Sequence, residues 1–180
     1  MQATAARGGT HRRTALRPTM PSLAQVRELT EVLRMQVPPE WEDLNGHVNV
    51  QHYTGMYDRA GTAMMALLGI GEDWVRSTRV GLFDLEHHIW FLDELHVGDE
   101  VAVHACFTGR NAKRIQGVVF LVDLTRGRLA SAMEYLSTAA NLDTRRTVPL
   151  PEEVARGLDG LIARVATLDW VVPSSGAISL

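Results

Sequence analysis

Four polar side chains stand close together in the loop before the first segment with helical periodicity. Residues 40–49 read EWEDLNGHVN and supply Asp43, Asn45, His47 and Asn49. The first turn of a helix leaves backbone N–H groups unbonded and carries the positive end of the helix dipole. Such donors can hold the oxyanion that forms on an attacked carbonyl, and an ionised carboxylate nearby can attack that carbonyl or deprotonate a water molecule. The loop can therefore support chemistry at a carbonyl, with Asp43 as its reactive group.

The same spacing also has a purely structural explanation. Asx residues are common in turns before helices, where their side chains bond backbone N–H groups, so Asp43 and Asn45 can be turn residues and nothing more. His47 can act as a catalytic base, but we expect it to order the loop through hydrogen bonds instead. Asn49 is expected to be the N-cap that holds the start of the helix in place.

Two patterns suggest a metal, and both fail on spacing. A calcium loop starting at Asp43 needs glycine at its sixth position and glutamate at its twelfth, but Gly46 is the fourth residue and Thr54 the twelfth. Zinc needs several ligands on one side, whereas the adjacent His87 and His88 of a predicted strand point to opposite faces. With a single cysteine in the chain, Cys-based zinc sites are excluded as well. We therefore expect no metal and no other cofactor.

Hydrophobic periodicity predicts the elements that must position this loop. Apolar residues recur at helical spacing over 50–68, and an alternation of period two follows in the second half of the chain. The prediction is a short helix at 22–29, a strand at 30–37, the long helix at 50–68, a helical turn at 72–76, strands at about 80–92, 99–109, 113–124 and 129–142, and a surface helix at 149–164. The short connections between the last four strands predict an antiparallel meander. A mostly apolar helix must be buried, and a curved antiparallel sheet wrapped around it is an economical α+β solution.

The segment from Val37 to Tyr53 resembles the hotdog-fold thioesterases of the 4-hydroxybenzoyl-CoA thioesterase type. Their pattern is an Asp three residues before a Gly, then His, an aliphatic residue and Asn, and later a Tyr in the helix. The residues that match it are Asp43, Gly46, His47, Val48, Asn49 and Tyr53. The stretch from Leu85 to Asp99 is similar to the second strand of these proteins and the turn after it. The resemblance covers roughly residues 30–150 and implies a hotdog fold, with about five strands around one central helix.

This resemblance implies an acyl-CoA thioesterase that acts on a small or medium acyl group, and the carnitine and betaine acyl-CoA thioesterases are the most similar subgroup. It makes Asp43 the catalytic carboxylate and assigns the carbonyl-polarising N–H to Val50, seven residues later. The alternative is a hotdog module that binds acyl-CoA without catalysis, as a sensor or partner protein. Asp43 favours the enzyme, because a pure binding module has no use for a carboxylate beside the thioester. A hotdog dehydratase would need an acid–base arrangement that the sequence lacks.

Further residues are candidates for substrate binding. Basic residues at one predicted hairpin can contact the phosphates of CoA, although a solvated turn explains them equally well. Aromatic residues can form a cage for a quaternary ammonium acyl group, although core packing explains them as well. The resemblance adds the loop residues and one strand histidine. The predicted substrate-binding set is Asn45, Gly46, Tyr53, Tyr57, His88, Trp90, Arg110, Lys113 and Arg114.

The whole chain, 180 residues with a formal net charge of −3, sets broad limits on the function. It has no basic stripe for nucleic acid and no apolar run of the ~18 residues that would span a membrane, so neither partner is expected. One cysteine, Cys106, fits a buried strand position and a reducing compartment such as the cytoplasm. We expect a leader at 1–21, which is either disordered or an Arg-rich transit peptide, one hotdog domain at 22–166, and a tail at 167–180.

The resemblance also implies an assembly. The second strand of the family's sheet usually lies at an edge and pairs with the same strand of a partner. Residues 82–92 of this chain are rich in apolar side chains, and an exposed edge of that kind is an aggregation hazard unless it is covered. We therefore expect a homodimer with active sites at the interface, which can stack further into a homotetramer.

Overall fold

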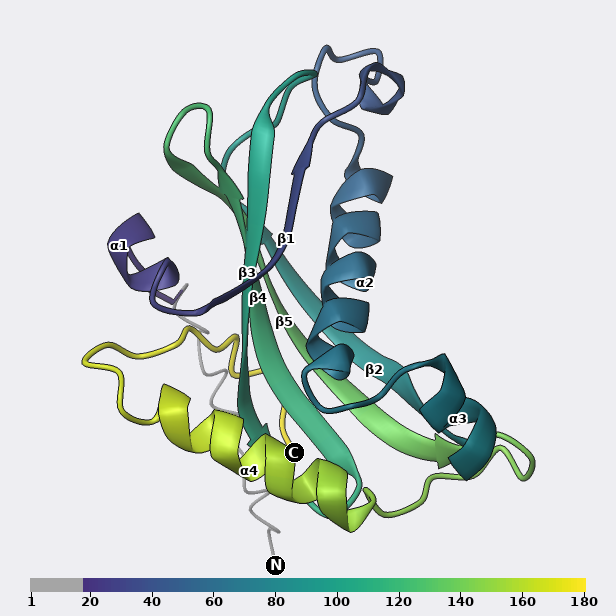
Figure 1. Ribbon diagram of the computed structural model, residues 1–180. Coiled ribbons are helices and arrows are strands. Elements are labelled where there is room, and N and C mark those ends of the chain that lie inside the picture. Colours follow the sequence, from purple (N-terminus) through teal and green to yellow (C-terminus); the bar gives the residue numbers. More distant parts are fainter. Residues whose placement is uncertain (1–17) are drawn as a thin grey trace, which may run out of the picture.

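One long helix lies along a five-stranded antiparallel sheet that curves around it (Figure 1). The structure, a computed structural model, describes residues 18–180. The elements are α1 (Leu23–Val26), β1 (Thr30–Gln36), η1 (Pro39–Trp41), α2 (Val50–Ala66), α3 (Glu72–Thr78), β2 (Val80–Phe91), β3 (Glu100–Arg110), β4 (Arg114–Asp123), β5 (Arg128–Asn141) and α4 (Glu152–Val165). The predicted α+β arrangement of five strands around one central helix is confirmed.

The main core lies between α2 and the inner face of the sheet. The buried residues of α2 are Tyr53, Met56, Tyr57, Ala60 and Met64, which recur at the spacing that predicted the helix. They pack against inward-facing strand residues of β3, β4 and β5 in one apolar cluster. Burying each large side chain in this way contributes about 1.5–3 kcal/mol, so the position of α2 against the sheet is firmly determined.

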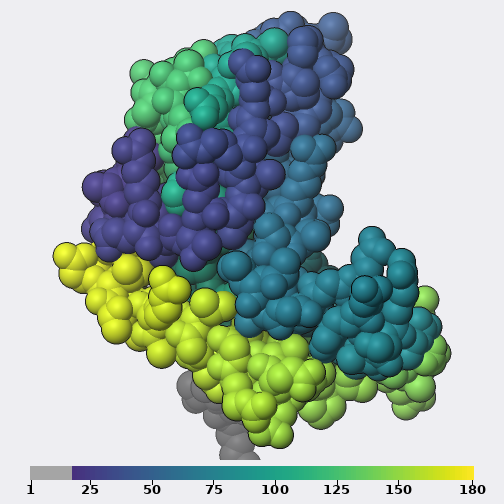
Figure 2. All heavy atoms as spheres, viewed as in Figure 1, coloured from purple at the N-terminus to yellow at the C-terminus, as the bar shows by residue number. Residues whose placement is uncertain are grey.

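A second apolar cluster covers the outer face of the sheet. It contains Trp90, Cys106 and Phe120, and the short helix α1 and residues of the C-terminal tail pack over it. Figure 2 shows the C-terminal residues in yellow lying against the purple N-terminal part of the fold.

A buried carboxylate holds the C-terminal tail in place through hydrogen bonds. Glu134 of β5 accepts hydrogen bonds from the Gln116 side chain, the Ser174 hydroxyl and the Ser175 backbone N–H.

The sheet is not the simple meander that the short connections predicted. The strand order is β1-β3-β4-β5-β2, so β2 pairs with β5 at the far edge and not with β3. The turn at Val97-Gly98-Asp99 does not close a hairpin; instead the Gly98 N–H donates to the Val37 carbonyl, and the Val37 N–H donates to the Asp99 carbonyl. The prediction of a simple meander was wrong because these hydrogen bonds hold the β2–β3 connection at the end of β1, and the connection crosses the start of α2 to reach it.

The division of the chain stays a prediction. The expected leader, 1–21, lies mostly outside the described residues, and the expected limits of the domain at 22–166 and of the tail at 167–180 are not tested by the fold. Among residues 18–180, no helix combines the length and the apolar character needed to cross a membrane.

Candidate functional site

The loop before α2 folds as a small hairpin that places Asp43 opposite His47. Glu42 and Val48 form an isolated antiparallel bridge, and the Asp43 N–H donates to the His47 carbonyl over 2.9 Å. The Gly46 N–H donates a hydrogen bond to the Asp43 carbonyl. Gly46 has a φ of +79°, a left-handed conformation that favours glycine. The glycine of the motif is therefore explained by the turn that it makes.

The carboxylate of Asp43 is partly buried, and only one of its two oxygens has interaction partners among the described residues. Its side chain keeps 18% of its accessible surface. Oδ1 accepts a 2.8 Å hydrogen bond from the Asn45 N–H and lies 3.7 Å from Nδ1 of His47, while Oδ2 has no hydrogen bond to the described residues. Nδ1 of His47 also lies 3.2 Å from the Val48 carbonyl oxygen. The structural role that we considered for Asp43 is thus present, and it leaves one oxygen free for chemistry.

The start of α2 offers one unbonded backbone N–H. Asn49 is the N-cap as predicted, because its side chain accepts from the Gln51 N–H over 3.1 Å. The Asn49 N–H is used as well, since it donates to the Trp41 carbonyl. Val50 is the first residue of the helix, and among the described residues its N–H has no acceptor. The residue is 57% exposed. The chain therefore presents an N–H for an incoming oxygen at the position predicted for the oxyanion hole.

A cavity of about 420 Å³ opens at this end of the helix. Its lining is His47, Val48, Val50, Tyr53, Phe91, Leu92, Asp93 and Glu94. The segment that follows β2 forms one wall, and Leu95 is fully buried there. The Val48 N–H donates to the Leu95 carbonyl, and the Leu95 N–H donates to the Tyr53 hydroxyl. The connection that crosses the fold thus fixes both the loop and the first turns of α2.

A second cavity, of about 550 Å³, runs along α2 from Gln51 and lies between the helix and strands β2 and β5. Asp84 of β2 lines it, accepts a hydrogen bond from the Ser137 hydroxyl, and lies 3.0 Å from Nε2 of His87. The interaction with His87, helped by Ser137, outweighs partial burial and lowers the pKa of Asp84. A charged carboxylate is therefore available in this cavity at neutral pH.

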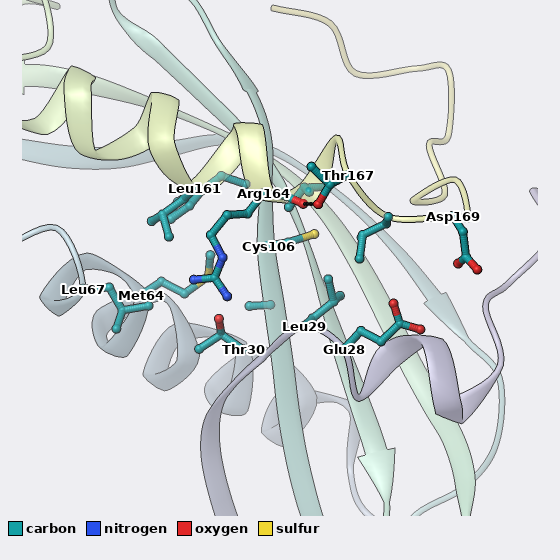
Figure 3. A pocket seen from close by; sticks show the side chains of 14 residues that line it. Glu28, Leu29, Thr30, Met64, Leu67, Cys106, Leu161, Arg164, Thr167 and Asp169 are labelled. Carbon is teal, nitrogen blue, oxygen red and sulfur yellow. Dashed lines mark hydrogen bonds between the residues drawn. The ribbon is translucent and has the colours of Figure 1, made fainter.

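A third cavity, of about 450 Å³, lies where α4 meets β3 and the C-terminal half of α2 (Figure 3). Arg164 projects into it from α4, and Cys106 lies at its floor. Burial raises the pKa of the Cys106 thiol to about 12, which makes it unreactive. None of the predicted site residues lines this cavity.

The predicted aromatic residues divide between the two faces of the sheet. Tyr53 and Tyr57 lie on the inner side; Tyr57 is buried and donates a 2.6 Å hydrogen bond to the Ser131 hydroxyl. Trp90 belongs to the outer cluster, and the ring of His88 lies 4.6 Å from it. The predicted cage is therefore not assembled within one protomer, and His88 does not face α2.

The predicted basic group does not gather around Asp43. Arg110 forms a two-pronged ion pair with Asp159 of α4, at 2.7 and 2.6 Å, and so ties α4 to the end of β3. Lys113 and Arg114 are exposed in the β3–β4 turn. That turn and the start of α2 lie at opposite ends of the sheet in Figure 1, and an 11-residue strand such as β3 spans about 35 Å. One protomer does not bring these cations to the proposed thioester site.

Sequence reasoning missed several polar residues that line the two cavities beside α2. Asp84, Tyr135 and Ser137 face the helix from β2 and β5, and Asp93 and Glu94 follow β2. The local pattern does not single out Asp84, because simple alternation puts it on the same face as the polar residues Glu86 and His88.

Comparison with known proteins places the chain in context. A sequence profile described as the thioesterase-like superfamily matches residues 37–158. A betainyl-CoA thioesterase of Pseudomonas aeruginosa is 30% identical over 125 residues, which are 69% of this chain and 79% of that protein. The L-carnitine dehydrogenase/betainyl-CoA thioesterase of Ruegeria pomeroyi is 27% identical over 157 residues, 84% of this chain and 30% of that protein. A Staphylococcus aureus protein solved in complex with CoA has a TM-score of 0.74 and 23% identity, covering 84% of this chain and 95% of that one.

Proposed function

Because the chain belongs to the thioesterase-like superfamily and has a hotdog fold, we propose that it hydrolyses the thioester of an acyl-CoA with Asp43 and the Val50 N–H as its catalytic groups. The activity at this level, thioester hydrolysis in the acyl-CoA class, follows from the family and from the relatives. The residues and the acyl group are our proposal. A small or medium acyl group is expected, and the names of the two relatives make betainyl-CoA the first substrate to test.

The unbonded Val50 N–H at the start of α2, seven residues after a carboxylate that has one oxygen without a hydrogen bond to the described residues, is the observation that carries this proposal. In the reaction, the thioester carbonyl oxygen accepts a hydrogen bond from this N–H, and the helix dipole stabilises the developing negative charge. Asp43 then either deprotonates a water molecule that attacks the carbonyl carbon or attacks it directly. The tetrahedral intermediate collapses with loss of the CoA thiolate. His47 and Asn49 hold the hairpin and the helix start in position.

A second copy of the chain is part of the proposal. Strand β2 is an edge of the sheet, and its exposed side chains include Phe83 (40%), Leu85 (47%) and Phe91 (48%). Phe91 also lines the cavity at the start of α2, so a partner strand on this edge would help to enclose the site. We propose a homodimer through β2, able to stack into a homotetramer, in the cytoplasm. Light scattering that gives a monomer mass at micromolar concentration would overturn the dimer.

The test of the catalytic proposal is a panel of acyl-CoA thioesters with short, aromatic and trimethylammonium acyl groups, assayed by release of free CoA. Asp43→Asn keeps a side-chain oxygen for the Asn45 N–H and so preserves the turn, but it removes the base. We expect kcat to fall by ~10²–10⁴. Asp73→Asn, on the exposed surface of α3, is the matched control and should leave the rate unchanged. An unaltered rate in Asp43→Asn would remove Asp43 from the mechanism.

Two further results separate the alternatives. If the protein binds CoA thioesters with micromolar affinity and hydrolyses none of them, the non-catalytic acyl-CoA-binding module is the better description. If it is active, a single turnover in H₂¹⁸O tests for direct attack. Water that adds to the Asp43 carbonyl of the mixed anhydride leaves ¹⁸O in the Asp43 carboxylate, whereas activation of water puts the label only in the released acid. Label in Asp43 therefore demonstrates the covalent route, and a rapid acid quench that does or does not trap the acyl-enzyme decides the case in which only the released acid is labelled.

A further inference from the structure

The cavity of about 550 Å³ beside α2 has an unusual charge pattern. Its 16 lining residues include the carboxylates of Asp58 and Asp84 and the imidazole of His87, but no lysine and no arginine. Its volume lies in the range of small-molecule sites. One of its lining residues is Gln51, which follows Val50 in the chain. A cavity with this lining favours a positively charged occupant and disfavours a negatively charged one.

Asp84 is held in place by both of its oxygens. One accepts a hydrogen bond from the Ser137 hydroxyl, and the other lies 3.0 Å from Nε2 of His87. The pKa of this carboxyl group lies below its usual range, chiefly because of His87, so the group is charged at neutral pH. Because both of its oxygens already have partners, Asp84 would attract a ligand mainly through its negative charge. A quaternary ammonium group, which has no N–H to donate, matches that chemistry.

Tyr135 contributes an aromatic ring to the lining of this cavity. Only 7% of its surface is exposed, and its buried hydroxyl has no hydrogen-bond partner among the described residues. The ring lies over Gly117, where an added Cβ would come within 2.5 Å of the hydroxyl oxygen, so the glycine makes room for it. An unsatisfied buried hydroxyl costs about 1–3 kcal/mol. Together with Tyr57, it gives the cavity two aromatic rings.

We propose that this cavity receives the acyl group and that Asp84 determines specificity by binding a positive charge on it. The inference rests on the proposed function, and it adds the residue that selects the substrate. A compact acyl chain that ends in a quaternary ammonium group fits the charge, the aromatic lining and the volume. An acyl chain that ends in a carboxylate would meet the carboxylates of Asp58 and Asp84 and no lysine or arginine.

The test uses two substrates of the same shape. Betainyl-CoA carries a trimethylammonium group, and 3,3-dimethylbutyryl-CoA has a carbon atom in place of the nitrogen. The trimethylammonium group itself activates the thioester by electron withdrawal, so the quantity compared is the ratio of kcat/KM for the cationic and the neutral substrate in the wild-type protein and in Asp84→Asn. Because the Asp84 side chain is 58% exposed and solvent screens such a charge pair, this ratio should fall about 2- to 5-fold in Asp84→Asn, while kcat/KM for the neutral substrate stays within about twofold of the wild-type value.

Asp73→Asn is the matched control, since Asp73 is a fully exposed carboxylate of α3 that lies outside the cavity and outside β2, and the rates with both substrates should be unaffected. Equal wild-type hydrolysis of the two substrates would overturn the inference and leave the thioesterase intact, and this comparison needs no variant to fold. Hydrolysis of no acyl-CoA would overturn the proposed function and the inference together. A parallel loss of both activities in a folded Asp84→Asn would show a structural role only and would also overturn the inference.

Discussion

Replacing Val50 by proline would remove one backbone N–H and disturb little else. Val50 is the first residue of α2, where proline is well tolerated because that N–H makes no bond within the helix. The residue before a proline must be extended, and Asn49 already has φ −61° and ψ 141°. The valine side chain is exposed, so the core loses no packing. The substitution therefore isolates the group that we assign to the oxyanion hole.

The expected loss can be worked out from this geometry. The capping bond from the Gln51 N–H to the Asn49 side chain stays, and the free energy of unfolding should change by less than about 0.5 kcal/mol. If the Val50 N–H stabilises the oxyanion, its removal should cost about 2.7–4 kcal/mol in the transition state, a fall of ~10²–10³ in kcat. KM should change little, because the hydrogen bond strengthens mainly in the transition state.

The assay is CoA release at saturating substrate, with thermal unfolding measured on the same samples. Val50→Ala is the control, since it removes the side chain but keeps the N–H, and its kcat should stay within about threefold of the wild-type value. A Val50→Pro protein that unfolds at the wild-type temperature and hydrolyses at the wild-type rate would refute the oxyanion hole at this position. The carbonyl would then have to be polarised by another group.

Two further predictions concern the rest of the fold. Burial raises the pKa of Cys106 to about 12, so the native protein at pH 8 holds almost no thiolate and should react with a thiol reagent far more slowly than free CoA does. In guanidinium chloride one thiol per chain should react. Rapid labelling of the native protein would contradict the burial of Cys106. Glu134→Ala removes three hydrogen bonds to a buried carboxylate and should lower the free energy of unfolding by roughly 3 kcal/mol, or Tm by about 6–12 °C, with faster proteolysis after residue 166. An unchanged Tm would mean that the three hydrogen bonds to Glu134 do not stabilise the C-terminal tail.

Local patterns in the sequence were enough to predict most of the secondary structure and the helix start that forms part of the candidate site. The helix predicted at 50–68 is observed at Val50–Ala66, and Asn49 caps it as expected, because periodicity and capping chemistry act between near neighbours. The predicted strand limits also lie within about two residues of those observed. The free N–H of Val50 follows from the same local rule, since the first N–H of a helix lacks a partner.

The inner and outer faces of β2 could not be predicted in the same way. A β-bulge between Asp84 and Glu86 inserts an extra residue, so that Leu82 and Asp84 face α2 before it and His87 and Ile89 face α2 after it. The bulge therefore turns Trp90 to the outer face, where simple alternation from Leu82 would have placed it inside. Nothing in the local sequence marks this bulge, because its place is set by the pairing of β2 with β5.

Tyr53 shows how the non-local part of the fold creates the site. Its position in the motif suggested that it binds substrate, and it lines the cavity at the start of α2, while its hydroxyl oxygen accepts a hydrogen bond from the N–H of Leu95. The carbonyl of the same Leu95 accepts from Val48, two residues before the first residue of α2. Tyr53 and Val48 thus hold the β2–β3 connection from both sides and fix the hairpin that carries Asp43. We therefore expect Tyr53 to act on the reaction by positioning, because its hydroxyl oxygen supports the segment that holds the hairpin carrying Asp43.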